Sequence, residues 1–262
     1  MKKIITILPL IYFSILLCAQ DNSPYEKKFF IKNKDTLRYR IMYPLNFDGN
    51  KKYPLLLFLH GAGERGNNNE LQLVHGSKLI ADPANREKYP AFVIFPQCSS
   101  DDFWANIKRR KSMVDTSKLV FEFPTDIPMG KSLSLVSQLL DSFVTTKNIN
   151  TRRIYVGGLS MGGMGTFELL WRKPGFFAAA IPICGGGNET MVKSYGKKLP
   201  IWVFHGDADP VVDVSHSRKM VAALKLAKAK VKYTEYPRVG HDSWNNAFAE
   251  PKLLQWLFDE KK

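Results

Sequence analysis

The chain has 262 residues, 45% of them apolar, and a formal net charge of +14 at pH 7. A chain of this length can bury a substantial core in one domain, so its fold requires no framework of disulfides or metal ions. The basic residues are scattered, and the densest run of them, Lys108–Lys111, lies in no known nucleic-acid-binding motif. We interpret the positive charge as a solvated basic surface and expect no nucleic-acid partner.

Residues 1–19 have the order of a secretory signal peptide. Two lysines precede an apolar run, Ile4–Leu17, and the small residue Ala19 follows. The run is too short for a comfortable membrane span of about 20 residues, and no later stretch is long and apolar enough either. We expect cleavage after Ala19, export, and one soluble domain over residues 20–262. A lipid anchor at Cys18 is the alternative, although the residue before it is bulkier than such sites favour.

Apolar runs and amphipathic stretches alternate along the mature chain. Two short runs near its start predict a pair of antiparallel strands, Phe29–Ile31 and Leu37–Tyr43. Six further runs are mostly continuous and apolar, as is typical of parallel strands buried on both faces: Leu55–Leu59, Phe92–Phe95, Arg153–Val156, Ala178–Ile183, Ile201–Phe204 and Val231–Tyr236. Helices are predicted near Glu70–Ile80, Leu133–Val144, Met161–Trp171, Ser215–Ala227 and Pro251–Phe258. The alternation predicts one α/β domain with a mainly parallel central sheet and helices on both faces.

One connection, Cys98–Gly130, is longer than the handful of residues usual between a strand and a helix. It is rich in aromatic residues, namely Phe103, Trp104, Phe121 and Phe123. A long aromatic loop at the carboxyl edge of a parallel sheet can form a wall of a substrate site. It can equally pack its rings against its own base, and both interpretations stay open.

The strongest chemical signal is the pentapeptide Gly158-Leu159-Ser160-Met161-Gly162. It follows the predicted strand Arg153–Val156 and opens the predicted helix Met161–Trp171, which is the strand–turn–helix context of a nucleophile elbow. Such a turn raises the serine hydroxyl above the sheet, and small neighbours let the strand and the helix approach each other. Glycine-rich turns without a catalytic serine are common, but this context favours Ser160 as a nucleophile.

A serine hydroxyl is a weak nucleophile unless a base contacts it. In this arrangement the partners follow in the order serine, acid, histidine, which leaves His205, His216 and His241. His205 precedes every suitable acid, and His216 begins a helix, where we expect a surface position. His241 lies between the last predicted strand and the last predicted helix. We predict His241 as the base.

Two acids, Asp207 and Asp209, follow the predicted strand Ile201–Phe204. Asp209 lies further along the loop, from where it can reach across to the histidine. Asp207 is better suited to stabilise the turn through its own backbone. We predict Asp209 as the acid that orients His241, with Asp207 as the alternative.

An oxyanion hole needs two backbone N–H groups that point at the developing negative charge. Met161, the residue after the nucleophile, supplies one of them. The second is expected from the loop after the strand Leu55–Leu59, which reads His60-Gly61-Ala62-Gly63. We predict Ala62 as this donor, with Gly61 as the alternative.

Two segments resemble nucleotide-binding motifs but lack the flanking residues that these motifs require. Gly61–Gly66 has the spacing of a dinucleotide fingerprint, but it leads into three asparagines rather than an apolar helix. Gly130-Lys131-Ser132 imitates the end of a phosphate loop, yet Thr125 stands where its first glycine is needed. Cys98 and Cys184 have no zinc-ligand spacing. We expect neither a cofactor nor a metal ion.

Taken together, the motifs resemble one family. It is the group of exported bacterial esterases with the α/β-hydrolase fold labelled phospholipase/carboxylesterase or "predicted peptidase", related to polyhydroxybutyrate depolymerases and to feruloyl or acetylxylan esterases. The resemblance covers nearly the whole mature chain and rests on the motifs His60–Gly66, Pro96–Cys98, Gly158–Gly163, Pro182–Gly187, His205–Asp209 and Gly240–Trp244. It implies the fold and a Ser-His-Asp triad. It implies no particular substrate, because the segment Phe103–Phe123 departs from the family pattern.

The resemblance implies two-step hydrolysis of carboxylic esters, on small molecules or attached to a polysaccharide. Esters are favoured over peptides, since related peptidases usually carry a gating domain for which this chain has no room. Trp104 and Trp244 are candidates for an aromatic pocket that would suit feruloyl or other aryl esters, with ordinary packing as the alternative for each. A serine peptidase of the same fold and a non-catalytic binding module are the alternative functions.

The usual strand order of this fold also bears on Cys98 and Cys184, the two cysteines of the mature chain. Their strands lie three spacings apart in that order, about 14 Å at ~4.8 Å each. A disulfide requires Cα atoms within about 7 Å of each other. We therefore expect two free thiols.

Overall fold

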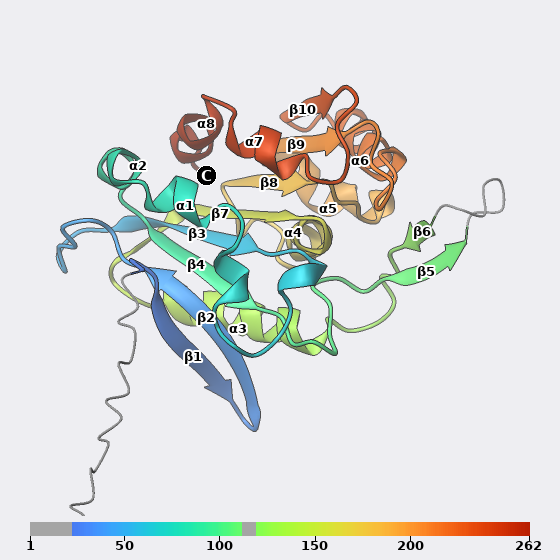
Figure 1. The fold of residues 1–262 in the computed structure, drawn as a ribbon. Helices are drawn as coiled ribbons and strands as arrows, with labels where there is room; N and C mark the ends of the chain where they lie inside the picture. The colour runs from blue at the N-terminus through green and yellow to red at the C-terminus, as the bar shows by residue number, and fades with distance from the viewer. Residues whose placement is uncertain (1–22, 112–118) are drawn as a thin grey trace, which may run out of the picture.

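A computed structural model describes residues 23–111 and 119–262 of the chain (Figure 1). The predicted signal peptide and Cys18 lie outside the described residues, and so does the segment 112–118 within the long connection. In the described part of the chain, no helix is long and apolar enough to cross a membrane.

Eight strands form the central sheet, in the spatial order β1-β2-β4-β3-β7-β8-β9-β10. The strand β2 pairs antiparallel with both β1 and β4. The remaining pairings, from β4 through β3, β7, β8 and β9 to β10, are all parallel. Their bounds are β1 Glu26–Lys32, β2 Asp35–Met42, β3 Tyr53–Leu59, β4 Phe92–Gln97, β7 Ile149–Leu159, β8 Ala179–Ile183, β9 Ile201–Gly206 and β10 Val231–Tyr236. The predicted antiparallel start and mainly parallel sheet are confirmed.

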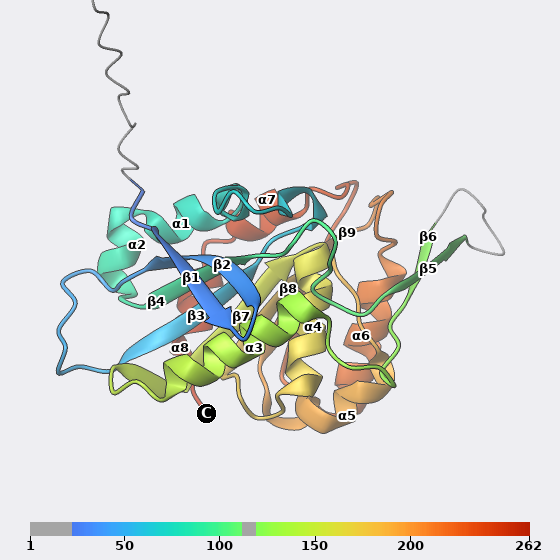
Figure 2. The same ribbon diagram turned by 90° about the horizontal axis from the view of Figure 1, so that it is seen from below.

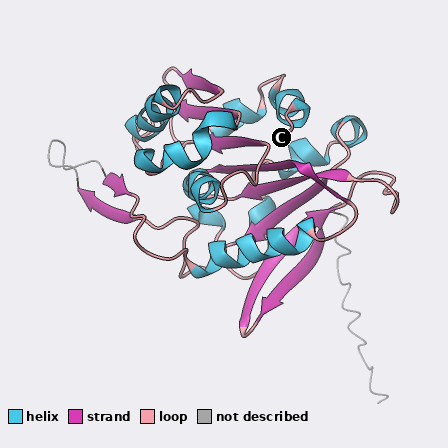
Figure 3. Ribbon diagram, turned by 180° about the vertical axis from the view of Figure 1, so that it is seen from behind, coloured by secondary structure: helices cyan, strands magenta, loops and turns pink. Residues whose placement is uncertain are grey.

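Helices cover both faces of the sheet, as predicted (Figures 2 and 3). One face carries α3 (Lys131–Val144), α4 (Met161–Arg172), α5 (Val192–Tyr195) and α6 (Ser215–Leu226). The other carries α1 (Ser77–Ala81), α2 (Pro83–Lys88), α7 (Trp244–Phe248) and α8 (Leu253–Asp259).

Alternate side chains of the central strand β3 pack on opposite faces of the sheet. Leu55, Leu57 and Leu59 of β3 pack toward the first group of helices. Leu56 and Phe58 pack toward the second group. Because successive side chains of a strand point to opposite faces, a strand covered on both must be apolar at every position. This explains the continuous apolar runs in the sequence.

One predicted helix, Glu70–Ile80, is broken in the structure. A single 3-10 turn, Leu71–Leu73, is followed by the short helix α1. Gly76 lies between them with a φ of 79°, in the left-handed region that interrupts a helix, and the Phe248 ring occupies the space that a side chain there would need. The prediction of one continuous helix was therefore wrong.

The long connection Cys98–Gly130 contains a β-hairpin that was not predicted. Its strands, β5 (Lys108–Lys111) and β6 (Leu119–Glu122), pair antiparallel and project from the body of the domain (Figures 1 and 3). All four residues of β5 are exposed. A strand of four basic residues has no apolar periodicity, so the hydrophobic pattern could not reveal it.

Three aromatic rings of this connection pack against the domain. Trp104 is fully buried in the core. Phe121 and Phe123 join Met164 and Val212 in a separate apolar cluster at the base of the hairpin. Of the two interpretations of the aromatic loop, packing against its own base therefore describes these three rings.

Cys98 and Cys184 are buried and unpaired, as predicted. They follow β4 and β8, and the strands β3 and β7 separate these two in the sheet. Burial raises the pKa of the Cys98 thiol to about 12 and that of the Cys184 thiol well above its ordinary value. Both are therefore protonated at neutral pH.

Candidate active site

Ser160 stands on a sharp turn between β7 and α4. Its φ of 53° and ψ of −117° place it in a region that residues other than glycine rarely adopt. The Ser160 N–H donates to the Ile183 carbonyl of β8 at 2.9 Å, which ties the turn to the neighbouring strand. The helix begins at the next residue, so Ser160 lies at the carboxyl edge of the sheet.

The turn depends on close backbone contacts that only glycine permits. A Cβ on Gly162 would overlap the Leu59 carbonyl oxygen at the end of β3. A Cβ on Gly158 would overlap the Gly162 carbonyl oxygen. The absence of these side chains lets β7, α4 and the end of β3 meet around Ser160.

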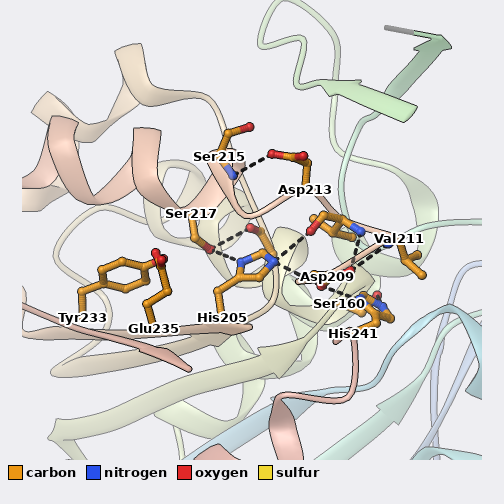
Figure 4. A network of polar contacts seen from close by, with 12 residues as sticks. Ser160, His205, Asp209, Val211, Asp213, Ser215, Ser217, Tyr233, Glu235 and His241 are labelled. Carbon is orange, nitrogen blue, oxygen red and sulfur yellow. Dashed lines mark hydrogen bonds and ion pairs between the residues drawn. The ribbon is translucent and has the colours of Figure 1, made fainter. Parts of the chain in front are cut away.

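The side chains of Ser160, His241 and Asp209 form a continuous hydrogen-bonded chain (Figure 4). His241 Nε2 lies 2.9 Å from Ser160 Oγ, and His241 Nδ1 lies 2.7 Å from Asp209 Oδ2. The three residues follow β7, β10 and β9, respectively. The Asp209 side chain is fully buried, whereas 20% of the His241 side chain is exposed. This arrangement can move a proton from the hydroxyl to the imidazole and can stabilise the resulting positive charge.

The Asp209 carboxylate accepts four N–H groups. Its Oδ1 accepts the N–H groups of Val211 and Val212 at 2.8 and 2.9 Å. Its Oδ2 lies 2.7 Å from His241 Nδ1 and 3.2 Å from His205 Nε2. Burial alone would raise the pKa of this carboxyl, but the hydrogen bonds from the two histidines and from the Val212 N–H hold its pKa well below the ordinary value. Asp209 is therefore ionised at neutral pH.

Asp207, the alternative acid, has another partner. It is exposed, and its Oδ1 accepts the Arg238 N–H at 2.6 Å. This bond ties the loop after β9 to the loop after β10. The structure thus brings Asp209, and not Asp207, into contact with His241.

His205 contacts Asp209, which was not predicted from the sequence. It is fully buried at the end of β9, four residues before Asp209. The order of serine, acid and histidine along the chain gives His205 no role, and only the short His-to-Asp spacing at a strand end could have drawn attention to it. His216, expected at the surface, is buried too, with Nε2 3.4 Å from the Phe121 N–H.

Met161 and Ala62, the predicted oxyanion donors, each begin a helical turn. Met161 is the first residue of α4, and Ala62 is the first residue of the 3-10 turn Ala62–Glu64. The N–H groups in the first turn of a helix have no acceptor within that helix. The loop that contains Ala62 also lies beside Ser160, because a Cβ on Gly61 would stand 3.7 Å from Ser160 Cβ.

His60 anchors this loop from inside the protein. Its Nε2 accepts the Cys98 N–H at 3.0 Å, so Nδ1 carries the proton and donates to the Gly61 carbonyl at 2.6 Å. The Trp104 indole N–H donates to the His60 carbonyl at 3.1 Å. Burial lowers the pKa of His60 to about 4, so its ring is neutral at neutral pH.

The two tryptophans predicted to line a substrate pocket occupy different places. Trp244 is half-buried, and its ring centre lies 5.4 Å from that of His241. Trp104 is fully buried and packs edge-on against the His60 ring. We therefore correct the prediction for Trp104, because a ring whose surface is covered by the core cannot contact a substrate. Trp244 lies beside His241, and its role stays a prediction.

In the described part of the chain, one group of side chains has a spacing suited to a metal ion. The possible ligand atoms of Cys184, Asp209 and His241 all lie within 4.8 Å of one another. His241 and Asp209 are already hydrogen-bonded to each other, and the Cys184 sulfur is a protonated thiol, which is a poor ligand. These side chains suit proton transfer better than metal binding.

Comparison with known proteins places this geometry in context. The sequence model of the family described as phospholipase/carboxylesterase matches residues 47–252. A bifunctional acetylxylan esterase/xylanase of Neocallimastix patriciarum is 35% identical over 88 residues, which are 34% of this chain and 13% of that protein. The lysophospholipase-like protein 1 of Mus musculus is 26% identical over 211 residues, which are 77% of this chain and 84% of that protein.

A crystal structure of a thermostable esterase superposes with a TM-score of 0.80 at 35% sequence identity. The superposition covers 91% of this chain and 64% of that one. The chain therefore spans a small part of the Neocallimastix enzyme and just under two thirds of the thermostable esterase.

His60→Gln tests the role of the neutral His60 ring. The pKa of His60 is about 4 in the folded protein, against about 6.5 for an exposed histidine, so acid protonates the unfolded chain first. The contribution of the neutral His60 ring to the free energy of unfolding is complete above pH 6.5 and is lost as the pH falls toward 4. Between pH 7 and pH 4.5, we expect the wild type to lose about 2 kcal/mol more unfolding free energy than the variant.

Urea denaturation of both proteins at several pH values measures this difference. The wild-type curve, compared with the variant at each pH, isolates the contribution of His60 from that of the other titratable groups. A pH dependence identical in the two proteins would contradict the assignment of a buried, neutral His60.

Proposed function

Because the chain belongs to the phospholipase/carboxylesterase family and has the α/β-hydrolase fold, we propose that Ser160, His241 and Asp209 are the catalytic triad of a carboxylic-ester hydrolase. The observation that carries the proposal is the hydrogen-bonded chain from Ser160 Oγ through both nitrogens of His241 to Asp209. Nucleophile, base and orienting acid are thus in contact before any substrate arrives.

In the first step, Ser160 Oγ attacks the ester carbonyl while His241 Nε2 accepts the hydroxyl proton. The 2.9 Å separation of these two atoms allows the transfer without rearrangement. The positive charge that forms on His241 is stabilised by Asp209, which is ionised and buried. Asp209 also keeps the His241 proton on Nδ1, so that Nε2 is free to act as the base.

The negative charge that develops on the carbonyl oxygen requires donors. The N–H groups of Met161 and Ala62 are proposed for this role, because both begin a helical turn and Gly61 lies against Ser160. The loss of one such donor typically costs about 10²–10³-fold in rate. The bonds of His60 to Gly61 and Cys98 hold the second donor loop in place.

Acylation is complete when His241 gives its proton to the leaving alcohol, and the acyl group stays on Ser160. A water molecule then gives a proton to His241 and attacks the acyl carbonyl. The carboxylic acid leaves, and Ser160 recovers its hydroxyl proton. The same side chains serve both half-reactions, and the acyl-enzyme on Ser160 links them.

Acetyl, feruloyl or related esters on a plant polysaccharide are the substrate class we propose. The name of the Neocallimastix relative includes acetylxylan esterase activity. The half-buried Trp244 ring beside His241 adds a flat apolar surface on which an aryl group or a sugar ring can stack. Turnover of acetylated and feruloylated xylo-oligosaccharides, measured beside a lysophospholipid, tests this choice. A preference for the lysophospholipid would contradict it.

Export through a signal peptide over residues 1–19 is also proposed. The two lysines, the apolar run and Ala19 support it. Such a location would give the enzyme access to polymers outside the cell. A mature protein that begins at Gln20, found by N-terminal sequencing, is expected, and a lipid on Cys18 would contradict this cleavage.

Ser160→Ala should abolish ester turnover and leave the fold intact. In a triad enzyme, loss of the nucleophile costs about as much as loss of the whole triad, up to roughly 10⁶-fold in kcat. Initial rates on an activated aryl ester, with thermal melting as the control for folding, measure the effect. If the folded variant keeps more than a few per cent of the wild-type rate, Ser160 is not the nucleophile.

Asp209→Asn and Asp207→Asn form a matched pair, two residues apart in one loop. Asp209→Asn should lower kcat by about 10⁴-fold, because the amide no longer fixes the proton-bearing nitrogen of the histidine. Asp207→Asn keeps a carbonyl oxygen for the Arg238 N–H and should stay within about threefold of the wild type. Steady-state kinetics compare the two, and the reverse ranking would transfer the role to Asp207.

A further inference from the structure

His205 is a buried histidine that the proposed mechanism does not use. It lies at the end of β9, four residues before Asp209, and no part of its side chain is exposed. Ser160 faces His241 and not His205, so His205 cannot act as the general base. Figure 4 shows that its ring lies on the far side of Asp209 from the nucleophile.

The Nε2 atom of His205 faces two hydrogen-bond acceptors. Asp209 Oδ2 lies 3.2 Å away, and the Val212 carbonyl oxygen lies 2.9 Å away. An ionised carboxylate and a carbonyl have no proton to give, so the proton between these atoms must sit on His205 Nε2. His205 is thus a donor to the same carboxylate oxygen that accepts from His241.

The other ring nitrogen keeps His205 in this orientation. Its Nδ1 lies 2.7 Å from Ser217 Oγ, and that hydroxyl lies 3.1 Å from the Gly185 carbonyl oxygen. Ser217 is fully buried as well. A serine hydroxyl has one proton, so Ser217 either donates it to Nδ1 or accepts from a protonated Nδ1 and donates it to the Gly185 carbonyl. In both cases Ser217, on α6, gives Nδ1 a partner and holds the His205 ring in place.

We propose that His205 is a positioning residue for Asp209, and this proposal rests on the catalytic triad proposed above. The Asp209 Oδ1 atom is held by two backbone N–H groups, and in the described part of the chain its Oδ2 atom is held only by the two histidines. His241 gains and loses a proton, and with it a positive charge, in each half-reaction. His205 is the stationary partner that keeps Oδ2 aimed at His241 throughout the cycle.

Two substitutions separate the ends of the His205 ring. His205→Gln places an amide nitrogen near the position of Nε2, where it can still donate to Asp209. His205→Asn places its amide near the position of Nδ1, where it can still bond Ser217 but cannot reach Asp209. Asn is one methylene shorter than Gln and leaves a larger cavity at this buried position. His205→Met, which fills the space without a donor, is the control for packing, and a loss of kcat that the Asn and Met variants share reports on the Asp209 contact.

We expect His205→Asn to lower kcat by about 10- to 100-fold with KM nearly unchanged, in the range seen when a partner that orients a functional side chain is lost. His205→Gln should recover most of that loss. His205→Met, which fills the space without polar groups, is measured beside them in case the Asn variant does not fold. Thermal melting of each variant shows which ones are folded.

A double-mutant cycle shows whether the effect passes through Asp209. Added to Asp209→Asn, the His205→Asn change should cost less than about threefold, because the contact it removes is already altered. Three results would overturn the proposal: wild-type kcat in the folded Asn and Met variants, equal losses in the Asn and Gln variants, or full additivity in the cycle. Activity retained by Ser160→Ala would instead refute the triad itself, so the two failures are distinguishable.

Discussion

The site depends on one close approach between backbones. Gly162, in the first turn of α4, lies so near the Leu59 carbonyl at the end of β3 that no Cβ could stand between them. This contact brings α4, which begins directly after Ser160, against β3, the strand that leads into the loop of the proposed oxyanion donor Ala62. The strained φ of Ser160 follows, since the chain must turn sharply from β7 into α4 to make the approach. The proposed donors from Met161 and Ala62 lie on the two sides of this contact.

Hydrogen bonds of three histidines, His241, His60 and His205, lie around this contact, and the three differ in burial and in partners. His241 is partly exposed and can exchange a proton with Ser160 and with water. His60 is buried and neutral, and it ties the oxyanion loop to Cys98. His205 is buried and donates to Asp209. Burial and partners, not residue type, thus separate the proposed base, His241, from the two buried histidines that hydrogen-bond other groups.

The parts of the site that short motifs and their order along the chain encode could be predicted, and contacts that neither the motifs nor their order encode could not. The pentapeptide around Ser160 carries its own turn chemistry, and the order of the motifs pointed to Asp209 and His241. The core position of Trp104 depends on its contact with His60, 44 residues away, and no local pattern encodes it. The same holds for the bond from His205 to Ser217. The hairpin β5–β6 escaped prediction because its first strand is basic throughout.

Covalent labelling of the folded protein with a fluorophosphonate tests the central claim most directly, because only a serine activated by an adjacent base reacts quickly with such a probe. Mass spectrometry of the digested product locates the adduct. We predict a single adduct on Ser160, formed within minutes by the wild type and orders of magnitude more slowly after His241→Gln. Ester turnover without an adduct on Ser160, or equal labelling of both proteins, would contradict an active site built from Ser160, His241 and Asp209.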